Sequence, residues 1–143
     1  MQYFLLKTEP DVYGWQHLLE QQIGRWDGVR NRVARNQLRR MKLGDLAFFY
    51  HTGKERRIVG LVEVVKEHYP DPTAHGADFS CVDVKPVCAL SRPVTLAEVK
   101  ADPTLQEMVL VKSARLSVQP VTSAQFNYIL ALGDTRLPSG AGG

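Results

Sequence analysis

The segment with the clearest chemical potential is Gly24-Arg-Trp-Asp-Gly-Val-Arg-Asn31, in which a tryptophan lies in a polar, glycine-flanked stretch. An indole in such a position can stack on a nucleobase, a contact worth about 1–3 kcal/mol by alanine substitution. Neighbouring guanidinium groups can bind phosphate, and the amide of Asn31 can pair with a base edge. The alternative is a purely structural role for Trp26, as we expect for Trp15 in its apolar run beside Leu18.

Basic residues gather around this segment. Between positions 25 and 42 there are seven basic side chains and one acid, although the net charge of the whole chain is only +3. At about 100° per residue, Ala34, Leu38 and Met41 share one face of a helix, and basic residues occupy another. The alternative is an ordinary solvated helix face, but a basic stripe beside Trp26 suits an anionic partner, nucleic acid first. The expected phosphate contacts are Arg30, Arg32, Arg35 and Arg39.

Four consecutive side chains, Phe48-Phe49-Tyr50-His51, form a second group of interest. Successive side chains of a strand alternate between its faces, so Phe49 and His51 share one face and Phe48 and Tyr50 share the other. One pair must belong to the core. The other pair, which ends beside a turn, could line a pocket, and periodicity leaves open which pair that is.

Signatures of catalysis and metal binding are missing from the sequence. There is no phosphate-binding glycine loop, no Gly-x-Ser-x-Gly elbow and no His-Glu-x-x-His motif. His68 and His75 share one polar loop and offer at most a weak surface metal site. Cys81 and Cys88 have no second pair to complete a zinc site and are typical of small, half-buried thiols in a reducing cytoplasm. We therefore expect no metal, no cofactor, no catalysis and a cytoplasmic location.

The elements that must position these residues are short. Strands are expected over 3–7, 45–51, 58–65, 79–87 and 114–119, helices over 15–21 and 32–41, and loops over 23–31 and 68–78. Three further helices are expected after Thr95, Thr104 and Thr122, because each begins a capping-box spacing. This order favours an α+β fold, a small and mostly antiparallel barrel decorated by short helices, over a doubly wound parallel sheet.

We expect one domain over residues 1–135 and a disordered tail over 136–143. No run approaches the roughly 18 apolar residues of a membrane span. The first residues, Met-Gln-Tyr-Phe-Leu-Leu-Lys, lack the basic start of a secretory signal.

Several motifs, in this order along the chain, resemble the EVE domain family. They are Lys7-Thr8-Glu9-Pro10, Trp26-Asp-Gly-Val-Arg-Asn31, Lys42-Leu-Gly-Asp45 with Phe49-Tyr50-His51, Ile58-Val-Gly60, Tyr69-Pro-Asp-Pro72 and Leu116-Ser-x-Gln-Pro-Val121. The resemblance runs from residue 2 to about residue 132, and the Trp-Asp-Gly-Val-Arg-Asn run is its most specific part. It implies a PUA-like pseudobarrel and kinship with YTH domains, which hold a methylated adenine in an aromatic cage.

The resemblance also implies roles for particular residues. Trp26 would form one wall of a cage, and Tyr50 or His51 would form a second wall. Thr8 and Asn31 would hydrogen-bond to the base edge. The full base-binding set is Lys7 (a backbone or phosphate contact), Thr8, Trp26, Asn31, Phe49, Tyr50, His51, and Ser117 and Gln119 (closing the pocket).

The sequence thus predicts a non-catalytic domain that recognises a modified, for instance methylated, nucleobase in DNA or RNA. One alternative is a general RNA-binding PUA-like module that reads shape and phosphate. Another is an enzyme acting on a small nucleobase or nucleotide, with Lys7 or His51 as acid or base. The main prediction requires Trp26 to be open to solvent at the mouth of a cavity, so that Trp26→Ala would leave the fold intact. The modification and the oligomeric state stay open.

Overall fold

A mixed sheet of six strands organises the molecule, whose computed structural model describes residues 1–75 and 78–138. The strands are β1 (Tyr3–Thr8), β2 (Gly24–Trp26), β3 (Leu46–His51), β4 (Arg57–Pro70), β5 (Ser80–Thr95) and β6 (Val118–Val121). Their order in the sheet is β2-β5-β4-β3-β1-β6, and only β1 and β3 pair in parallel. β2 and β6 are its two edges, so the sheet that the described residues form is open and not a closed barrel.

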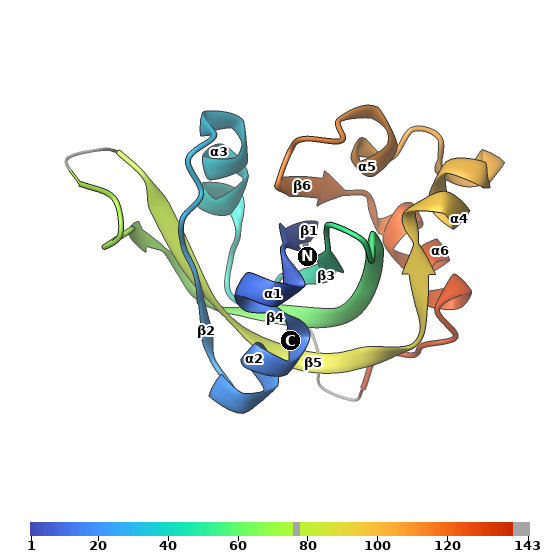
Figure 1. The fold of residues 1–143 in the computed structure, drawn as a ribbon, viewed down its shortest axis with the longest axis horizontal. Helices are drawn as coiled ribbons and strands as arrows, with labels where there is room; N and C mark the ends of the chain where they lie inside the picture. The colour runs from blue at the N-terminus through green and yellow to red at the C-terminus, as the bar shows by residue number, and fades with distance from the viewer. Residues whose placement is uncertain (76–77, 139–143) are drawn as a thin grey trace.

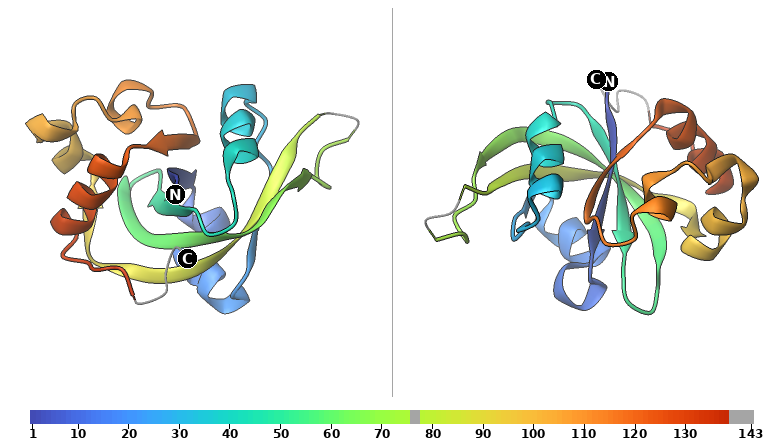
Figure 2. Two further views of the ribbon diagram at one scale, coloured as in Figure 1. Left: turned by 180° about the vertical axis from the view of Figure 1, so that it is seen from behind. Right: turned by 90° about the horizontal axis from the view of Figure 1, so that it is seen from above.

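Short helices cover this sheet on two sides. They are α1 (Pro10–Tyr13), α2 (Trp15–Gln21), α3 (Arg32–Arg40), α4 (Leu96–Ala101), the 3₁₀ turn η1 (Pro103–Leu105), α5 (Val109–Lys112) and α6 (Ser123–Leu132). Figure 1 shows β4 and β5 curving beneath β1, β3 and β6, with α3 towards one end of this trough and α4, α5 and α6 towards the other. Figure 2 shows the same separation from behind and from above. The expected α+β class, a mostly antiparallel sheet with short helices, is confirmed.

The core has two parts, one on each face of the sheet. Phe4, Leu6 and Phe49 pack with α2 and α3 on one face, and Leu5 and Phe48 pack with α4 to α6 on the other. Because β3 lies in the middle of the sheet, all six of its side chains are buried. Both pairs of side chains, Phe49 with His51 and Phe48 with Tyr50, are therefore buried, and the pair with Tyr50 also reaches a cavity.

Capping residues explain where most helices begin. Thr95 and Thr122 form the predicted capping boxes of α4 and α6. The box predicted at Thr104 is wrong, because Asp102 caps η1 instead and Pro103 occupies the first position of that turn. Pro10 similarly begins α1, where the sequence predicted only the end of a strand.

The strands differ from their predicted bounds wherever pairing partners lie far away in the sequence. β4 and β5 pair as far as Pro70 and Ser80, so β4 runs beyond the predicted end at residue 65. β5 continues to Thr95 through several register shifts rather than ending at residue 87. β6 begins only at Val118, and β2 occupies part of the predicted loop over 23–31.

Two expectations fall partly outside the described residues. Residues 136–138 of the predicted tail have no regular structure, and residues 139–143 are not described. Residues 76–77 of the predicted loop over 68–78 are also not described. Within the described ranges, no helix is both long enough and apolar enough to cross a membrane.

Candidate functional site

A cavity of about 920 Å³ opens beside Trp26, at the end of β1. Its walls come from β1, α1, the end of α2, β2, the segment that follows β2 and the loop that precedes β6. The lining residues are Lys7, Thr8, Val12, Tyr13, Gln21, Ile23, Arg25, Trp26, Asp27, Gly28, Val29, Arg30 and Ser117. Ligand sites commonly have volumes of about 300–1,000 Å³, so a planar heterocycle fits within this size range.

Trp26 is an aromatic wall of this cavity, but the residue is only 6% exposed. It packs edge-on against Phe49, with ring centroids 5.4 Å apart, and against Tyr13 at 6.0 Å. The expectation of a solvent-open ring in a loop is therefore wrong. β2 pairs with β5 as an edge strand and turns Trp26 inward, while Arg25 points outward. A hollow nevertheless adjoins the buried ring.

Polar groups from the end of β1 and from the loop before β6 meet in the cavity. The Thr8 hydroxyl donates to the carbonyl oxygen of Tyr13 at 2.8 Å, which leaves its oxygen able to accept a hydrogen bond. Lys7 Nζ donates to the carbonyl oxygen of Ala114 at 2.5 Å, and partial burial lowers the pKa of this lysine. The Ser117 hydroxyl has no hydrogen-bond partner within the part of the chain that the structure describes. The cavity thus offers donors and acceptors to a base edge.

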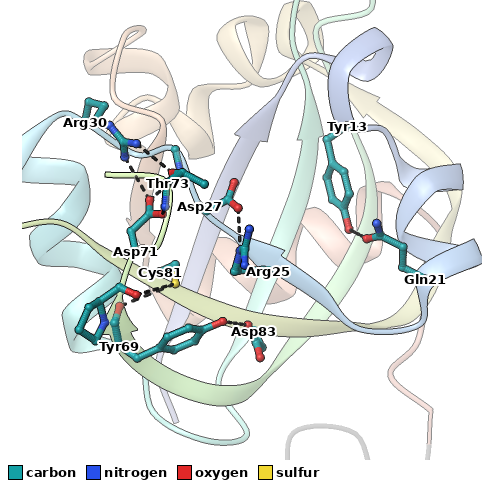
Figure 3. Close-up of polar contacts among 12 residues, drawn as sticks. Tyr13, Gln21, Arg25, Asp27, Arg30, Tyr69, Asp71, Thr73, Cys81 and Asp83 are labelled. Carbon is teal, nitrogen blue, oxygen red and sulfur yellow. Dashed lines mark hydrogen bonds and ion pairs between the residues drawn. The ribbon is translucent and has the colours of Figure 1, made fainter. Parts of the chain in front are cut away.

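Two hydrogen-bonded side-chain pairs are among the residues that line the cavity, and Figure 3 shows both pairs. The Tyr13 hydroxyl donates to Gln21 Oε1 at 2.6 Å. Arg25 Nε donates to Asp27 Oδ2 at 2.8 Å. Desolvation, together with the charge of Asp27, raises the pKa of Tyr13, so this hydroxyl stays protonated at neutral pH.

Asp71 anchors the segment that carries Trp26, and Figure 3 shows its contacts with Arg30 and Thr73. Its buried carboxylate accepts hydrogen bonds from the Gly28 backbone N–H at 2.8 Å and from Arg30 Nη1 at 3.1 Å. Its other oxygen accepts from the backbone and the hydroxyl of Thr73. Burial alone would raise the pKa of Asp71, but these hydrogen bonds outweigh it and lower the pKa to about 2. The sequence alone indicated no role for Asp71, although this residue belongs to the motif Tyr69-Pro-Asp-Pro72.

The structure brings five of the predicted site residues to the cavity and places the others elsewhere. The five are Lys7, Thr8, Trp26, Arg30 and Ser117. Asn31 caps α3, because its Oδ1 accepts from the backbone N–H of Ala34 at 3.0 Å. Phe49 is fully buried behind Trp26. Tyr50 is also buried and lines a neighbouring cavity rather than this one.

His51 and Gln119 make structural contacts instead of lining the cavity. His51 Nε2 accepts from the backbone N–H of Trp15 at 3.1 Å, and Nδ1 lies 2.9 Å from Glu55 Oε1, so both ring nitrogens are engaged. Gln119 is fully buried, and its Nε2 donates to the carbonyl oxygens of Ser113 and Leu116. Gln119 thereby holds the loop that carries Ser117.

The arginines of the predicted phosphate-binding stripe are largely paired with acids. Arg39 and Arg35 both contact Asp78, at 2.6 Å and 3.6 Å. Arg30 is paired with Asp71. Arg32 is exposed at the start of α3. Ala34 and Leu38 are buried as predicted, so the apolar face of the helix is confirmed.

An open, curved, mixed sheet with short helices and a cavity at the end of its first strand defines a domain of the PUA-like class. The chain belongs to the EVE domain family, whose sequence profile matches residues 2–132. The resemblance seen in the sequence motifs is therefore confirmed.

Known proteins show the same relationship. Human thymocyte nuclear protein 1 is 42% identical over 130 residues, which are 75% of this chain and 58% of that protein, so the chain spans little more than half of it. A solved protein from Agrobacterium tumefaciens is 42% identical with a TM-score of 0.92, covering 99% of both chains. The human THYN1 protein in complex with 5-methylcytosine-containing DNA is 37% identical with a TM-score of 0.85, covering 95% of this chain and 99% of that one.

A more distant neighbour shows likeness of fold alone. The YTH domain of the MRB1 protein from Zygosaccharomyces rouxii, in complex with N6-methyladenosine RNA, has a TM-score of 0.59 at 16% identity. The alignment covers 97% of this chain and 90% of that domain.

Proposed function

We propose that this chain is a non-catalytic reader that binds a modified nucleobase of DNA or RNA in the Trp26 cavity. The observation that carries the proposal is the meeting, in one hollow, of the Trp26 ring with the hydroxyls of Thr8 and Ser117 and the ammonium of Lys7. The aromatic surface suits the flat face of a base, and the polar groups suit its edge.

The related human protein supports the choice of ligand class. It has been solved with DNA that contains 5-methylcytosine, and it aligns with 95% of this chain. A methyl group buried in a tight pocket contributes about 0.8 kcal/mol, which is enough for a preference. A base must leave its duplex to enter such a cavity, at a cost of a few kcal/mol, so single-stranded or mismatched sites should bind best.

Removing the Ser117 hydroxyl is expected to weaken binding without disturbing the fold. Ser117→Ala should lower the affinity for 5-methyl-2′-deoxycytidine or for N6-methyladenosine, whichever the parent prefers, by about 0.5–1.5 kcal/mol, the contribution of one hydrogen bond. Isothermal titration calorimetry with each nucleoside and its unmethylated counterpart measures this. Mass spectrometry of the same samples should recover every nucleoside unchanged.

Ser91→Ala is the matched control, because Ser91 is an exposed β5 serine that does not line the cavity. It should bind like the parent. Equal losses in the two variants would contradict the proposed site, and equal affinity of the parent for methylated and unmethylated nucleosides would contradict the preference for a modified base. A nucleoside converted to product would contradict the non-catalytic role.

A further inference from the structure

A second cavity, of about 590 Å³, adjoins the Trp26 cavity. Lys7, Thr8 and Ser117 line both, so the two hollows meet at the end of β1 and the loop before β6. The turn between β3 and β4, α4 and α5 supply the remaining walls. Hydrogen bonds tie these segments together, because the Thr52 N–H donates to the carbonyl oxygen of Thr8 and the Leu96 N–H donates to that of Arg56.

The walls of the second cavity are strongly basic. Arg56, Lys100 and Arg115 join Lys7 there, against a single acid, Glu9. All three of these added cations are exposed, and none forms an ion pair with an acid in residues 1–75 and 78–138. Cations that lack internal partners are available to an external anion.

The backbone holds one of these cations in an unusual conformation. Arg56 has φ 45°, in the left-handed region that favours glycine. Its carbonyl oxygen accepts the hydrogen bond from Leu96 at 2.8 Å, which fixes it against the start of α4. A non-glycine residue kept in this region marks a constrained position, which is common at binding sites.

We propose that the second cavity binds the phosphate of the nucleotide whose base occupies the Trp26 cavity. This inference rests on the proposed function. Only a sugar separates a base from its phosphates, so a phosphate site must adjoin the base site, and Lys7, Thr8 and Ser117 provide that junction. Lysine and arginine are the residues that bind phosphate. Arg35 and Arg39 of α3, by contrast, already pair with Asp78.

The double variant Lys100→Gln/Arg115→Gln tests this inference. Its probes are 5-methyl-2′-deoxycytidine, the 5′-monophosphate of that nucleoside, and a single-stranded DNA with one 5-methylcytosine. DNA affinity should fall roughly tenfold at low salt. The slope of log K against log salt should flatten by about 1.4, because each of the two lost phosphate contacts on a single strand contributes roughly 0.7. Nucleoside affinity should stay unchanged.

The matched control is Arg35→Gln/Arg39→Gln, which removes the same charge from the helix stripe. It should keep the parent's DNA affinity and salt slope. A loss of affinity for the monophosphate in the Lys100/Arg115 variant assigns the cavity to the phosphate of the flipped nucleotide itself. A loss confined to the DNA would place a neighbouring phosphodiester in the cavity and would overturn the assignment to this nucleotide.

Two further results would also overturn the inference. One is a loss of DNA affinity in the Arg35/Arg39 variant with none in the Lys100/Arg115 variant. The other is an equal loss of nucleoside and DNA affinity in the Lys100/Arg115 variant. The proposed function fails separately, if the parent binds methylated and unmethylated DNA alike, and the salt slopes of the two variants would still locate the phosphate site. A parent that binds no DNA contradicts both.

Discussion

Replacing Trp26 with alanine is expected to lower the free energy of unfolding by about 3–5 kcal/mol. Trp26 is 6% exposed and its ring packs against Phe49 and Tyr13, so its removal leaves a void in the core. Domains of this kind are stable by only about 5–15 kcal/mol, so the loss is a large share of the total. Urea unfolding at pH 7 measures it. A variant as stable as the parent would contradict the burial of Trp26. This prediction replaces the expectation from the sequence that Trp26→Ala leaves the fold intact.

Because Trp26→Ala disturbs both packing and binding, the phenylalanine variants separate the two. Trp15 is the matched control, since it is 7% exposed, packs against the same Phe49 at 5.3 Å and does not line the cavity. Trp26→Phe and Trp15→Phe should both destabilise the fold moderately. Only Trp26→Phe should weaken nucleoside binding, by about 1 kcal/mol from the smaller stacking surface. Equal affinities of the two variants would contradict a role for Trp26 in binding.

Replacing Asp71 with asparagine is expected to lower the free energy of unfolding at pH 7 by about 2 kcal/mol. The folded pKa lies at about 2, below its ordinary value of 3.8, and this depression corresponds to about that energy. An amide also turns its own donor either towards Gly28 N–H and Arg30, which both donate to Oδ2, or towards Thr73, whose N–H and hydroxyl both donate to Oδ1. The Trp26 segment should loosen, and the affinity for the methylated nucleoside should fall with it.

The pH dependence of this variant follows from the direction of the shift. A carboxylate with a depressed folded pKa stabilises the protein above its unfolded pKa, and this stabilisation is lost as the pH falls through the folded pKa. The difference between parent and Asp71→Asn should therefore be full above about pH 4 and shrink towards pH 2. Asp78→Asn is the control, because its carboxylate is 82% exposed, and its stability should barely change. A constant difference from pH 7 to pH 2 would contradict the role of Asp71.

Elements with strong local signals could be predicted from the sequence. The bounds of α2 match, and α3 and α6 begin where the capping residues and apolar spacing placed them. β2 was missed because three residues are too few for a pattern and its partner, β5, lies far away in the sequence. The alternation of Arg25 and Trp26 is that of a strand, and a longer segment would have revealed it.

Contacts between segments that are distant in the sequence also determine the site, and they leave no local pattern. Polar neighbours led to the expectation that Trp26 is exposed, although Arg25 lies on the opposite face of the edge strand β2. Gly60 belongs to the motif Ile58-Val-Gly60, but the need for a glycine there comes from a tertiary contact. A Cβ at this position would stand 2.5 Å from the Trp15 ring. The pairing of α3 arginines with Asp78, and the contact of Asp71 with Gly28, likewise join segments about 40 residues apart.

The most direct test of base capture beside Trp26 is a nuclear magnetic resonance titration of ¹⁵N-labelled protein with 5-methyl-2′-deoxycytidine. The chain has two tryptophans, so each indole N–H gives its own signal. The Trp26 indole signal and the backbone signals of Thr8 and Ser117 should shift with saturation, while the Trp15 indole signal stays in place. Shifts that spare Trp26 and gather elsewhere on the molecule, or no shifts at millimolar nucleoside, would contradict capture of the base in this cavity.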